Sequence, residues 1–194
     1  MISYGNTGSM NIVLASRSPR RRLLLEQVGI NFEIITPRAE ETQPEGNALA
    51  DTVLQNAEAK ALSVLDISTA VPVLGADTLV DLHGDVLGKP SDSAEAVIML
   101  SKLSGALHKV YTGIVVIDSK TGTTYRDHAV TEVRFRTLTA EEIDDYVRSG
   151  DPLDKAGSYG IQGRGALFVE SINGCFYNVM GLPLSKLWQI LLKL

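Results

Sequence analysis

Basic residues gather at one point of an otherwise acidic chain. The stretch "LASRSPRRRLLL" contains four arginines within six positions. A helix N-terminus exposes free backbone N–H groups and a positive dipole, and an arginine adds paired donors that suit phosphate oxygens. We therefore expect Ser16, Ser18 and Arg20 to form an anion site. We expect Arg21 and Arg22 to be solvated positions on the helix surface.

Two acidic positions could hold a divalent cation or activate a water molecule. Asp77 follows Gly–Ala at the end of an apolar run, and Glu41 lies in a polar loop beside Glu40. Carboxylate oxygens are ligands that Mg²⁺ and Mn²⁺ prefer, and a carboxylate beside water can act as a general base. A second interpretation is open for each residue, because Asp77 could cap a turn and loop glutamates are usually just solvated.

Three lysines and one amide could complete a nucleotide site. Lys60 and Lys89 are candidates for neutralising a polyphosphate, and a glycine and a proline fix the loop on either side of Lys89. The stretch "DKAGSYGIQG" adds Lys155 and Gln162, whose amide can pair with a base edge through its donor and acceptor. The sequence contains no P-loop, dinucleotide fingerprint or zinc pattern. The chemistry expected is therefore metal-assisted, with oxygen ligands and water.

Composition limits the classes of function. The chain has 44% hydrophobic and 21% charged residues, which suits a single domain over residues 1–194. A net charge of −5 argues against general nucleic-acid binding. The one cysteine, Cys175, is expected to be a buried structural thiol in a reducing compartment. No stretch approaches a membrane span, so we expect a cytoplasmic protein without a membrane partner, with residues 1–9 as a leader of no structural consequence.

Strand and helix patterns alternate along the chain, which is typical of an α/β protein. Strands are expected over residues 11–15 and 31–37, as a pair within 71–90, as a long hairpin turning near 120–122, over 166–171 and around 175–179. Helices are expected over residues 19–29, 47–65, 93–105 and 140–150 and after Pro183, with capping boxes starting at Asp92 and Thr139. The order predicts a mixed, elongated sheet flanked by helices, in two lobes around a cleft.

Several motifs occur in an order that closely resembles one family. They are "LASRSPRRRLLL", "VLGADTLV", "GKP", "LSG", "TGI", "FRTLT", "DKAGSYGIQG" and "NVMGLP". Over residues 11–194 the chain resembles the Maf family, also called septum-formation-inhibitor-like nucleotide pyrophosphatases. The resemblance implies a two-lobed fold similar to that of inosine triphosphate pyrophosphatases, with a nucleoside triphosphate in the cleft. It also implies hydrolysis to the monophosphate and pyrophosphate with Mg²⁺ or Mn²⁺, and it makes a homodimer plausible.

The resemblance implies roles for individual residues of this sequence. Asp77 matches the catalytic acidic residue, and Glu41 matches a loop carboxylate that would join Asp77 at the metal. The positions that match phosphate-binding residues are Ser16, Arg20, Lys60, Lys89 and Lys155. Arg20, Thr78 and Gln162 look like the branch of the family that is specific for dTTP and UTP.

Two functions follow as hypotheses. The first is an enzyme, a nucleoside triphosphate pyrophosphatase that acts on dTTP, UTP and modified pyrimidine analogues. The second is a nucleotide-binding regulator of cell division in which hydrolysis is incidental, suggested by the family's link to septum formation. Nucleic-acid binding through the arginine cluster is disfavoured by the net charge and by the lack of interleaved aromatic residues.

Overall fold

A computed structural model describes residues 11–42, 48–67 and 71–194, so the leader expected over residues 1–9 lies outside it. The strands are β1 (Asn11–Ala15), β2 (Asn31–Ile35), β3 (Val73–Leu82), β4 (Asp85–Leu87), β5 (Leu107–Ile117), β6 (Thr124–Phe135) and β7 (Val169–Asn173). The α-helices are α1 (Pro19–Gln27), α2 (Leu49–Leu62), α3 (Ser93–Leu103), α4 (Ala140–Arg148), α5 (Phe176–Val179) and α6 (Leu184–Leu191). Short 3-10 helices are η2 (Asp151–Asp154), η3 (Ala156–Ser158) and η4 (Gly163–Phe168). Within the described ranges no helix is long and apolar enough to cross a membrane.

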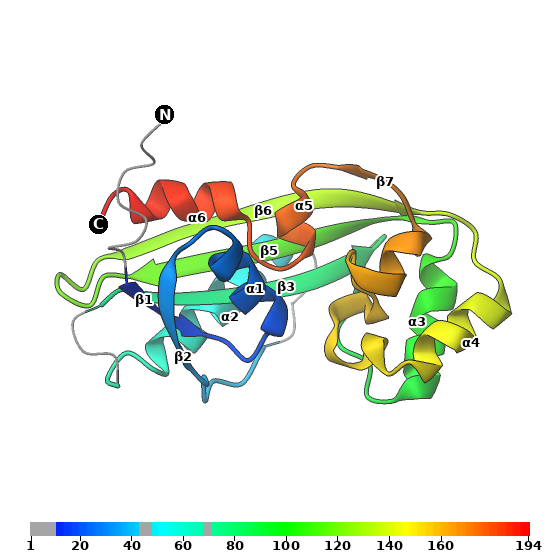
Figure 1. The fold of residues 1–194 in the computed structure, drawn as a ribbon, viewed down its shortest axis with the longest axis horizontal. Coiled ribbons are helices and arrows are strands. Elements are labelled where there is room, and N and C mark those ends of the chain that lie inside the picture. Colours follow the sequence, from blue (N-terminus) through cyan, green and yellow to red (C-terminus); the bar gives the residue numbers. More distant parts are fainter. Residues whose placement is uncertain (1–10, 43–47, 68–70) are drawn as a thin grey trace.

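A single mixed sheet runs the length of the molecule (Figure 1). Its seven strands follow the order β2-β1-β3-β5-β6-β7, and β4 pairs with β3 at the side. Strand β1 is parallel to both β2 and β3, whereas the pairs β3–β5, β5–β6 and β6–β7 are antiparallel. The predicted mixed sheet with a long central hairpin is therefore confirmed.

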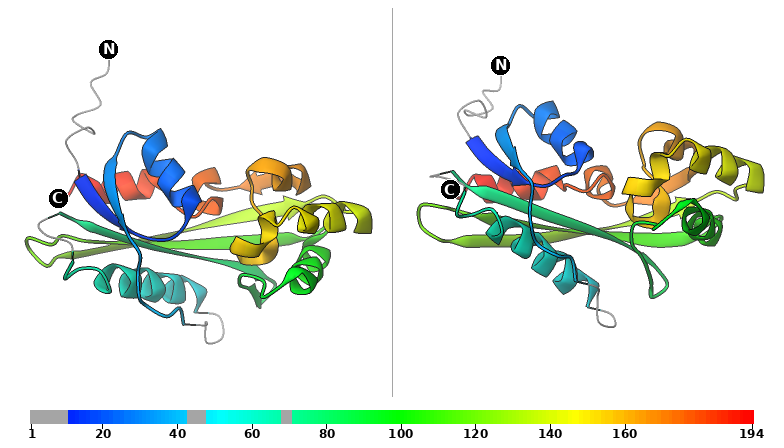
Figure 2. Two further views of the ribbon diagram at one scale, coloured as in Figure 1. Left: turned by 60° about the horizontal axis from the view of Figure 1, so that its bottom comes forward. Right: turned by 90° about the horizontal axis from the view of Figure 1, so that it is seen from below.

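The alternation of side chains along the strands divides the core between the two faces of the sheet. In β1, Ile12 and Leu14 pack in a cluster with residues of α1 and α6, whereas Val13 and Ala15 pack with residues of α2. Helix α2 accordingly covers one face, and α1 and α6 cover the other (Figure 2). A further cluster joins α3 and α4 to β3, β5 and β6 at the far end of the sheet and forms the second lobe. The predicted two-lobed arrangement is confirmed.

Two segments near the C-terminus differ from the prediction. The strand expected around residues 175–179 is instead the short helix α5, because the buried Asn178 turns inward and donates to the carbonyl of Val110 and to the hydroxyl of Thr131, both at 2.9 Å. The strand expected over 166–171 begins only at Val169. The residues before it form η4, which buries the ring of Phe168.

The capping boxes predicted at α3 and α4 differ in the backbone N–H group that donates to the glutamate carboxylate. At α4 the Thr139 hydroxyl accepts from the Glu142 backbone, and the Glu142 carboxylate accepts from the Thr139 backbone, as predicted. At α3 the Asp92 carboxylate accepts from the Glu95 backbone at 2.8 Å, but the Glu95 carboxylate accepts from the backbone of Ser91. Both helix starts therefore satisfy N–H groups that the helix itself leaves unpaired.

Two strand glycines allow α2 to lie directly against the sheet. A Cβ atom on Gly75 of β3 would lie 2.0 Å from the carbonyl oxygen of Ala57, and one on Gly113 of β5 would lie 2.6 Å from that of Val53. Real Cβ atoms do not approach backbone so closely, so any side chain at these positions would force α2 away from the strands. This helix carries Lys60 toward the centre of the sheet.

The substitution Gly75→Ala should lower the free energy of unfolding by about 3 kcal/mol, because the helix backbone cannot yield as a side chain would. Urea denaturation measures the change. The matched control is Gly88→Ala, where a Cβ atom meets open space and stability should stay within about 0.5 kcal/mol. Equal stability of the two variants would contradict the close approach.

Candidate active site

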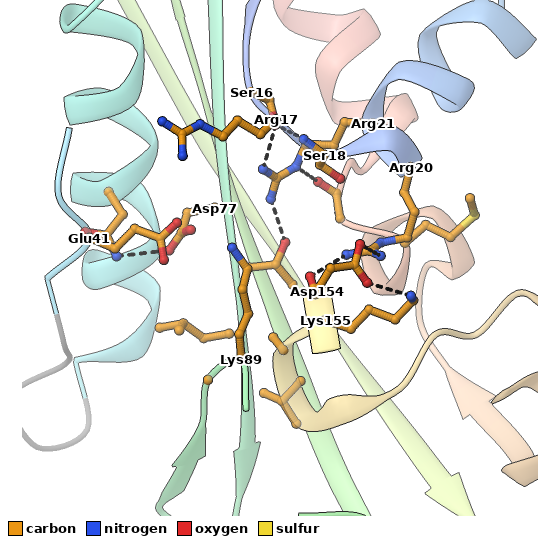
Figure 3. Close-up of a pocket in the computed structure, with 18 of the residues that line it drawn as sticks. Ser16, Arg17, Ser18, Arg20, Arg21, Glu41, Asp77, Lys89, Asp154 and Lys155 are labelled. Atoms are coloured by element: carbon orange, nitrogen blue, oxygen red, sulfur yellow. Dashed lines mark hydrogen bonds and ion pairs between the residues drawn. The ribbon is translucent and has the colours of Figure 1, made fainter. Parts of the chain in front are cut away.

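A cleft of about 550 Å³ lies between the two lobes (Figure 3). All ten residues predicted to form a site line this cleft: Ser16, Ser18, Arg20, Glu41, Lys60, Asp77, Thr78, Lys89, Lys155 and Gln162. Among the described residues, its lining holds seven basic side chains, namely Arg17, Arg20, Arg21, Arg38, Lys60, Lys89 and Lys155, against three acidic ones, Glu41, Asp77 and Asp154. The cleft is thus locally positive in an acidic chain and suits an anion.

Asp77 lies at the centre of this cleft, on β3. Its side chain is buried, and its two oxygens accept hydrogen bonds from Lys60 Nζ at 2.6 Å and from Asn56 Nδ2 at 3.0 Å. Lys60 Nζ also lies 2.7 Å from Glu41 Oε1. One ammonium group therefore bridges two carboxylates. Asn56 and Lys60 are one turn apart on α2, so the same face of the helix supplies both donors.

The electrostatics of the cluster keep Glu41 ionised. Partial burial opposes the charge on this carboxyl, but the hydrogen bond and the charge of Lys60 outweigh it, with smaller contributions from Lys89 and Arg21. The pKa of Glu41 is therefore lower than its ordinary value. A carboxylate with such a pKa can serve as a cation ligand throughout the neutral pH range.

The two carboxylates fit a divalent cation of the Mg²⁺ or Mn²⁺ type. Glu41 and Asp77 already converge on one positive charge, the Lys60 ammonium, and carboxylate oxygens are hard ligands. In the described part of the chain, no group of three His, Cys, Asp or Glu side chains could hold a metal ion. Mg²⁺ is often held by one or two carboxylates together with substrate phosphates, so a two-carboxylate set suits a cation that binds with the substrate.

Arg21 belongs to the site, and its interpretation as a solvated surface residue was wrong. Its side chain is buried and donates to the Gly181 carbonyl at 2.8 Å, to Ser16 Oγ at 3.3 Å and to Thr78 Oγ1 at 3.1 Å. Burial lowers the pKa of this guanidinium, and the charge of nearby carboxylates opposes that change. Arg22 is exposed and pairs with a glutamate one turn along α1, so its interpretation as a surface residue is confirmed.

The position of Arg21 depends on two hydroxyl groups that are hydrogen-bonded in series. Thr78 Oγ1 lies 3.0 Å from Thr112 Oγ1, which donates to the backbone carbonyl of Asn178 at 2.9 Å. The Thr78 hydroxyl can thus donate to Thr112 while it accepts from Arg21. Helix α5, which replaces the expected strand, supplies the acceptor at the end of this line.

A second charged cluster occupies the side of the cleft formed by η2. Lys155 is buried, and its ammonium donates to the Asp151 carbonyl at 2.5 Å, to Asp151 Oδ1 at 2.9 Å and to Asp154 Oδ1 at 2.7 Å. Arg20 reaches across from α1 and donates from Nη1 to Asp154 Oδ2 at 3.1 Å and from Nη2 to the Asp154 carbonyl at 3.4 Å. Figure 3 shows Arg20 and Lys155 on either side of Asp154.

Other side chains that line the cleft have no such internal partners. Among the described residues, the side chains of Arg17, Arg38 and Lys89 form no ion pair or hydrogen bond, and the amide of Gln162 forms no hydrogen bond. Apolar residues also line the cleft: Val80, Val110, Ile161, Val179 and Met180. The site therefore combines uncompensated positive charge with apolar surface, which suits a ligand with a charged part and a ring.

Five residues that line the cleft or support its charged groups were not assigned to the site from the sequence: Arg17, Arg21, Arg38, Asn56 and Asp154. For Arg21 a signal existed, because it stands three and four positions before Leu24 and Leu25 and so shares their buried helix face. Asn56 stands one turn before Lys60, which makes it a neighbour on the same face of α2. Asp154 directly precedes Lys155 in a motif already singled out, but nothing local indicates that it contacts α1.

The contacts of Arg21 predict a stability difference between two adjacent arginines. Arg21→Lys should lower the free energy of unfolding by about 2 kcal/mol, because one ammonium cannot reach the carbonyl and both hydroxyls that the guanidinium fork serves. The same substitution at exposed Arg22 should change it by less than about 0.5 kcal/mol. Urea denaturation of both variants is the measurement, and an unchanged midpoint for Arg21→Lys would contradict the burial of this side chain.

The fold and the cleft define an α/β protein with a predominantly basic cleft between two lobes. The sequence profile of the Maf family, described as Maf-like protein, matches residues 11–194, and the chain belongs to this family. A protein of Desulforamulus reducens named dTTP/UTP pyrophosphatase is 48% identical over 91% of this chain and 92% of its own length. A protein of Bacillus thuringiensis subsp. konkukian with the same name is 51% identical over 91% of each chain. The solved structure of the Staphylococcus aureus Ham1 protein is 16% identical, with a TM-score of 0.42 over 64% of this chain and 71% of that one.

Proposed function

We propose that this protein is a nucleoside triphosphate pyrophosphatase that hydrolyses dTTP and UTP to the monophosphate and pyrophosphate. The observation that carries the proposal is the buried cluster of Asp77, Lys60 and Glu41 in a cleft lined by seven basic side chains. Relatives that are about half identical to this chain carry the name dTTP/UTP pyrophosphatase. The predicted homodimer, cytoplasmic location, lack of nucleic-acid binding and regulatory alternative stay predictions.

The triphosphate fits the part of the cleft where positive charge is not already compensated. Arg17, Arg21, Arg38 and Lys89 form no ion pair with a carboxylate among the described residues, so their charge is available to attract the polyanion. Arg21 and the Ser16 hydroxyl lie beside the start of α1, where backbone N–H groups add further donors. Lys60 lies between Asp77 and Glu41 and would share its charge with the phosphates near the reacting centre.

The base fits beside Thr78 and Gln162, next to the apolar lining of the cleft. Uracil and thymine present the same edge, a ring N–H between two carbonyl groups. The oxygen of the Gln162 amide can accept from the ring N–H while its NH2 group donates to a carbonyl group. Cytosine presents an amino group and a bare ring nitrogen there, and the Gln162 amide would have to turn over to pair with it. The pairing suits dTTP and UTP alike and does not distinguish them by the thymine methyl group.

Asp77 is the residue best placed to act on the attacking water. One of its oxygens can accept a proton as the water oxygen forms a bond to the α-phosphorus. The bond from the α-phosphorus to the bridging oxygen then breaks, and pyrophosphate leaves with that oxygen. Asn56 and Lys60 hold the carboxylate in one orientation during this step. Positive side chains around the cleft stabilise the charge that develops on the leaving group.

Glu41 and Asp77 would hold the divalent cation that the family resemblance implies. A bound Mg²⁺ or Mn²⁺ supplies charge neutralisation at the phosphoryl oxygens. Lys60 contacts the same two carboxylates, so it keeps them together before the substrate arrives.

The substitution Asp77→Asn tests the proposed base. It should reduce pyrophosphate release from dTTP and UTP by at least about a thousandfold, because the amide cannot accept the proton although its shape is nearly the same. The matched control is Asp81→Asn on the same strand, where the carboxylate outside the cleft accepts from the backbone of Gly84 and activity should be unchanged. A folded Asp77→Asn variant with wild-type turnover would remove Asp77 from the mechanism.

Removal of divalent cations tests the role of the two carboxylates. Chelation should abolish hydrolysis, and added Mg²⁺ or Mn²⁺ should restore it. Glu41→Gln should raise the cation concentration needed for half-maximal activity by about tenfold, because one charged ligand is lost while Asp77 remains. The adjacent substitution Glu40→Gln provides the control and should leave that concentration unchanged. Full activity in chelator would contradict the metal-dependent mechanism.

A further inference from the structure

Lys155 is fully engaged within the protein. An ammonium group has three N–H donors. The three acceptors nearest to Lys155 Nζ are the Asp151 carbonyl, Asp151 Oδ1 and Asp154 Oδ1, all within 2.9 Å. A phosphate ligand of Lys155 would have to displace at least one of these bonds, because all three donors of the buried ammonium are already engaged. The geometry therefore argues against direct phosphate binding by this lysine.

Asp154 connects Lys155 to the opposite lobe. One of its carboxylate oxygens accepts from Lys155, and the other accepts from Arg20. Arg20 and Asp154 are 134 positions apart in the sequence, on α1 and η2. Among the described residues, Arg20 forms side-chain hydrogen bonds only with Asp154. The orientation of this guanidinium thus depends on a single aspartate.

Asp151 and Lys155, which hold Asp154 in place, are connected to the core through Tyr146. The hydroxyl of buried Tyr146 on α4 donates to Asp151 Oδ2 at 2.7 Å and accepts from the backbone N–H of Gly160 at 3.2 Å. Burial raises the pKa of Tyr146, and the Asp151 carboxylate raises it further, so the hydroxyl stays a donor. A continuous chain of hydrogen bonds therefore leads from α4 through Asp151, Lys155 and Asp154 to Arg20.

We propose that Asp154 is a positioning residue whose carboxylate, itself held by Lys155, fixes the guanidinium of Arg20 across the cleft. The proposal rests on the proposed function in one respect, because it assigns the free donors of Arg20 to the carbonyl groups of the pyrimidine. Arg20 has five N–H donors and uses two on Asp154, so three remain to face a ligand. Lys155 then acts through Asp154 and contacts no phosphate.

The charges of the cluster agree with this assignment. Arg20 and Lys155 are balanced by Asp151 and Asp154, so the cluster adds no net positive charge to the cleft. Burial opposes ionisation of Asp154, but Lys155 and Arg20 outweigh it and lower the pKa of this carboxyl below its ordinary value. A neutral cluster with oriented donors suits an uncharged base carbonyl better than a polyanion.

A double-mutant cycle tests the proposal. Asp154→Asn leaves one oxygen, which cannot serve both Arg20 and Lys155, and Lys155→Met removes the support of Asp154. Each should raise the KM for dTTP by about tenfold with little change in kcat, and the double variant should be no more than about twofold worse than either. Inhibition by inorganic pyrophosphate should stay unchanged in both. Asp145→Asn, at an exposed ion pair on α4, is the control and should leave all values unchanged.

Direct phosphate binding by Lys155 predicts the opposite pattern. The two effects on KM would then multiply, and Lys155→Met alone would weaken inhibition by pyrophosphate. Either result would overturn the proposal. Selectivity gives a further readout that a loss of folding would not produce, because Asp154→Asn should reduce the preference for dTTP over dCTP by about tenfold.

A measurement without substrate separates this proposal from the proposed function. Rotation of the Arg20 guanidinium can be followed by 15N NMR. The Arg20 signal is identified as the one that is lost in the Arg20→Lys variant. In the wild-type protein and in Asp145→Asn the rotation should be slow, whereas Asp154→Asn should accelerate it at least about fivefold. Unchanged rotation in Asp154→Asn would overturn the positioning role even if the enzyme is active. Slow wild-type rotation in a protein that hydrolyses neither nucleotide would leave the positioning role intact and overturn the proposed function.

Discussion

The cleft is organised around the ammonium of Lys60. It is buried between Asp77 and Glu41, and a buried charge is tolerated only when opposite charges and hydrogen bonds surround it. Asp77 in turn needs Lys60 and Asn56, so α2 must lie close to β3. The glycines of β3 and β5 make that approach possible, because neither carries a Cβ atom that would meet the helix backbone. Backbone packing thus fixes the separation of the groups that would perform the chemistry.

The rest of the site depends on elements from both lobes. The long strands β3, β5 and β6 run through both lobes and hold them on one sheet (Figure 1). Across the cleft, the two lobes also meet through side chains, with Arg20 of α1 on Asp154 of η2. Such an exposed ion pair contributes little to stability, so its importance lies in orientation. The shared sheet thus holds the two lobes rigidly, while the contact between Arg20 and Asp154 orients one side chain that lines the cleft.

Most of the fold could be predicted because its signals are local. The alternation of strands and helices, the hairpin turn near residue 120 and the Thr139 cap each depend on residues close together in sequence. The sequence also identified ten residues that the structure brings to one cleft. Arg21 was misjudged because the helix-face signal from Leu24 and Leu25 was not used and because two of its three acceptors, the Gly181 carbonyl and the Thr78 hydroxyl, lie 160 and 57 positions away. Helix α5 was missed for the same reason, since the partners of its buried asparagine lie on β5 and β6.

The distribution of charge explains how an acidic protein can present an anion site. Carboxylates compensate Arg20, Lys60 and Lys155, so these side chains orient groups more than they attract a polyanion. Arg17, Arg21, Arg38 and Lys89 form no ion pair with a carboxylate among the described residues and make the cleft locally positive. Basic side chains that are paired with carboxylates orient neighbouring groups, whereas basic side chains without such partners attract an anion. A ligand with a polyphosphate at one end and an uncharged ring at the other meets both requirements, which is why the cleft suits a nucleotide better than inorganic phosphate alone.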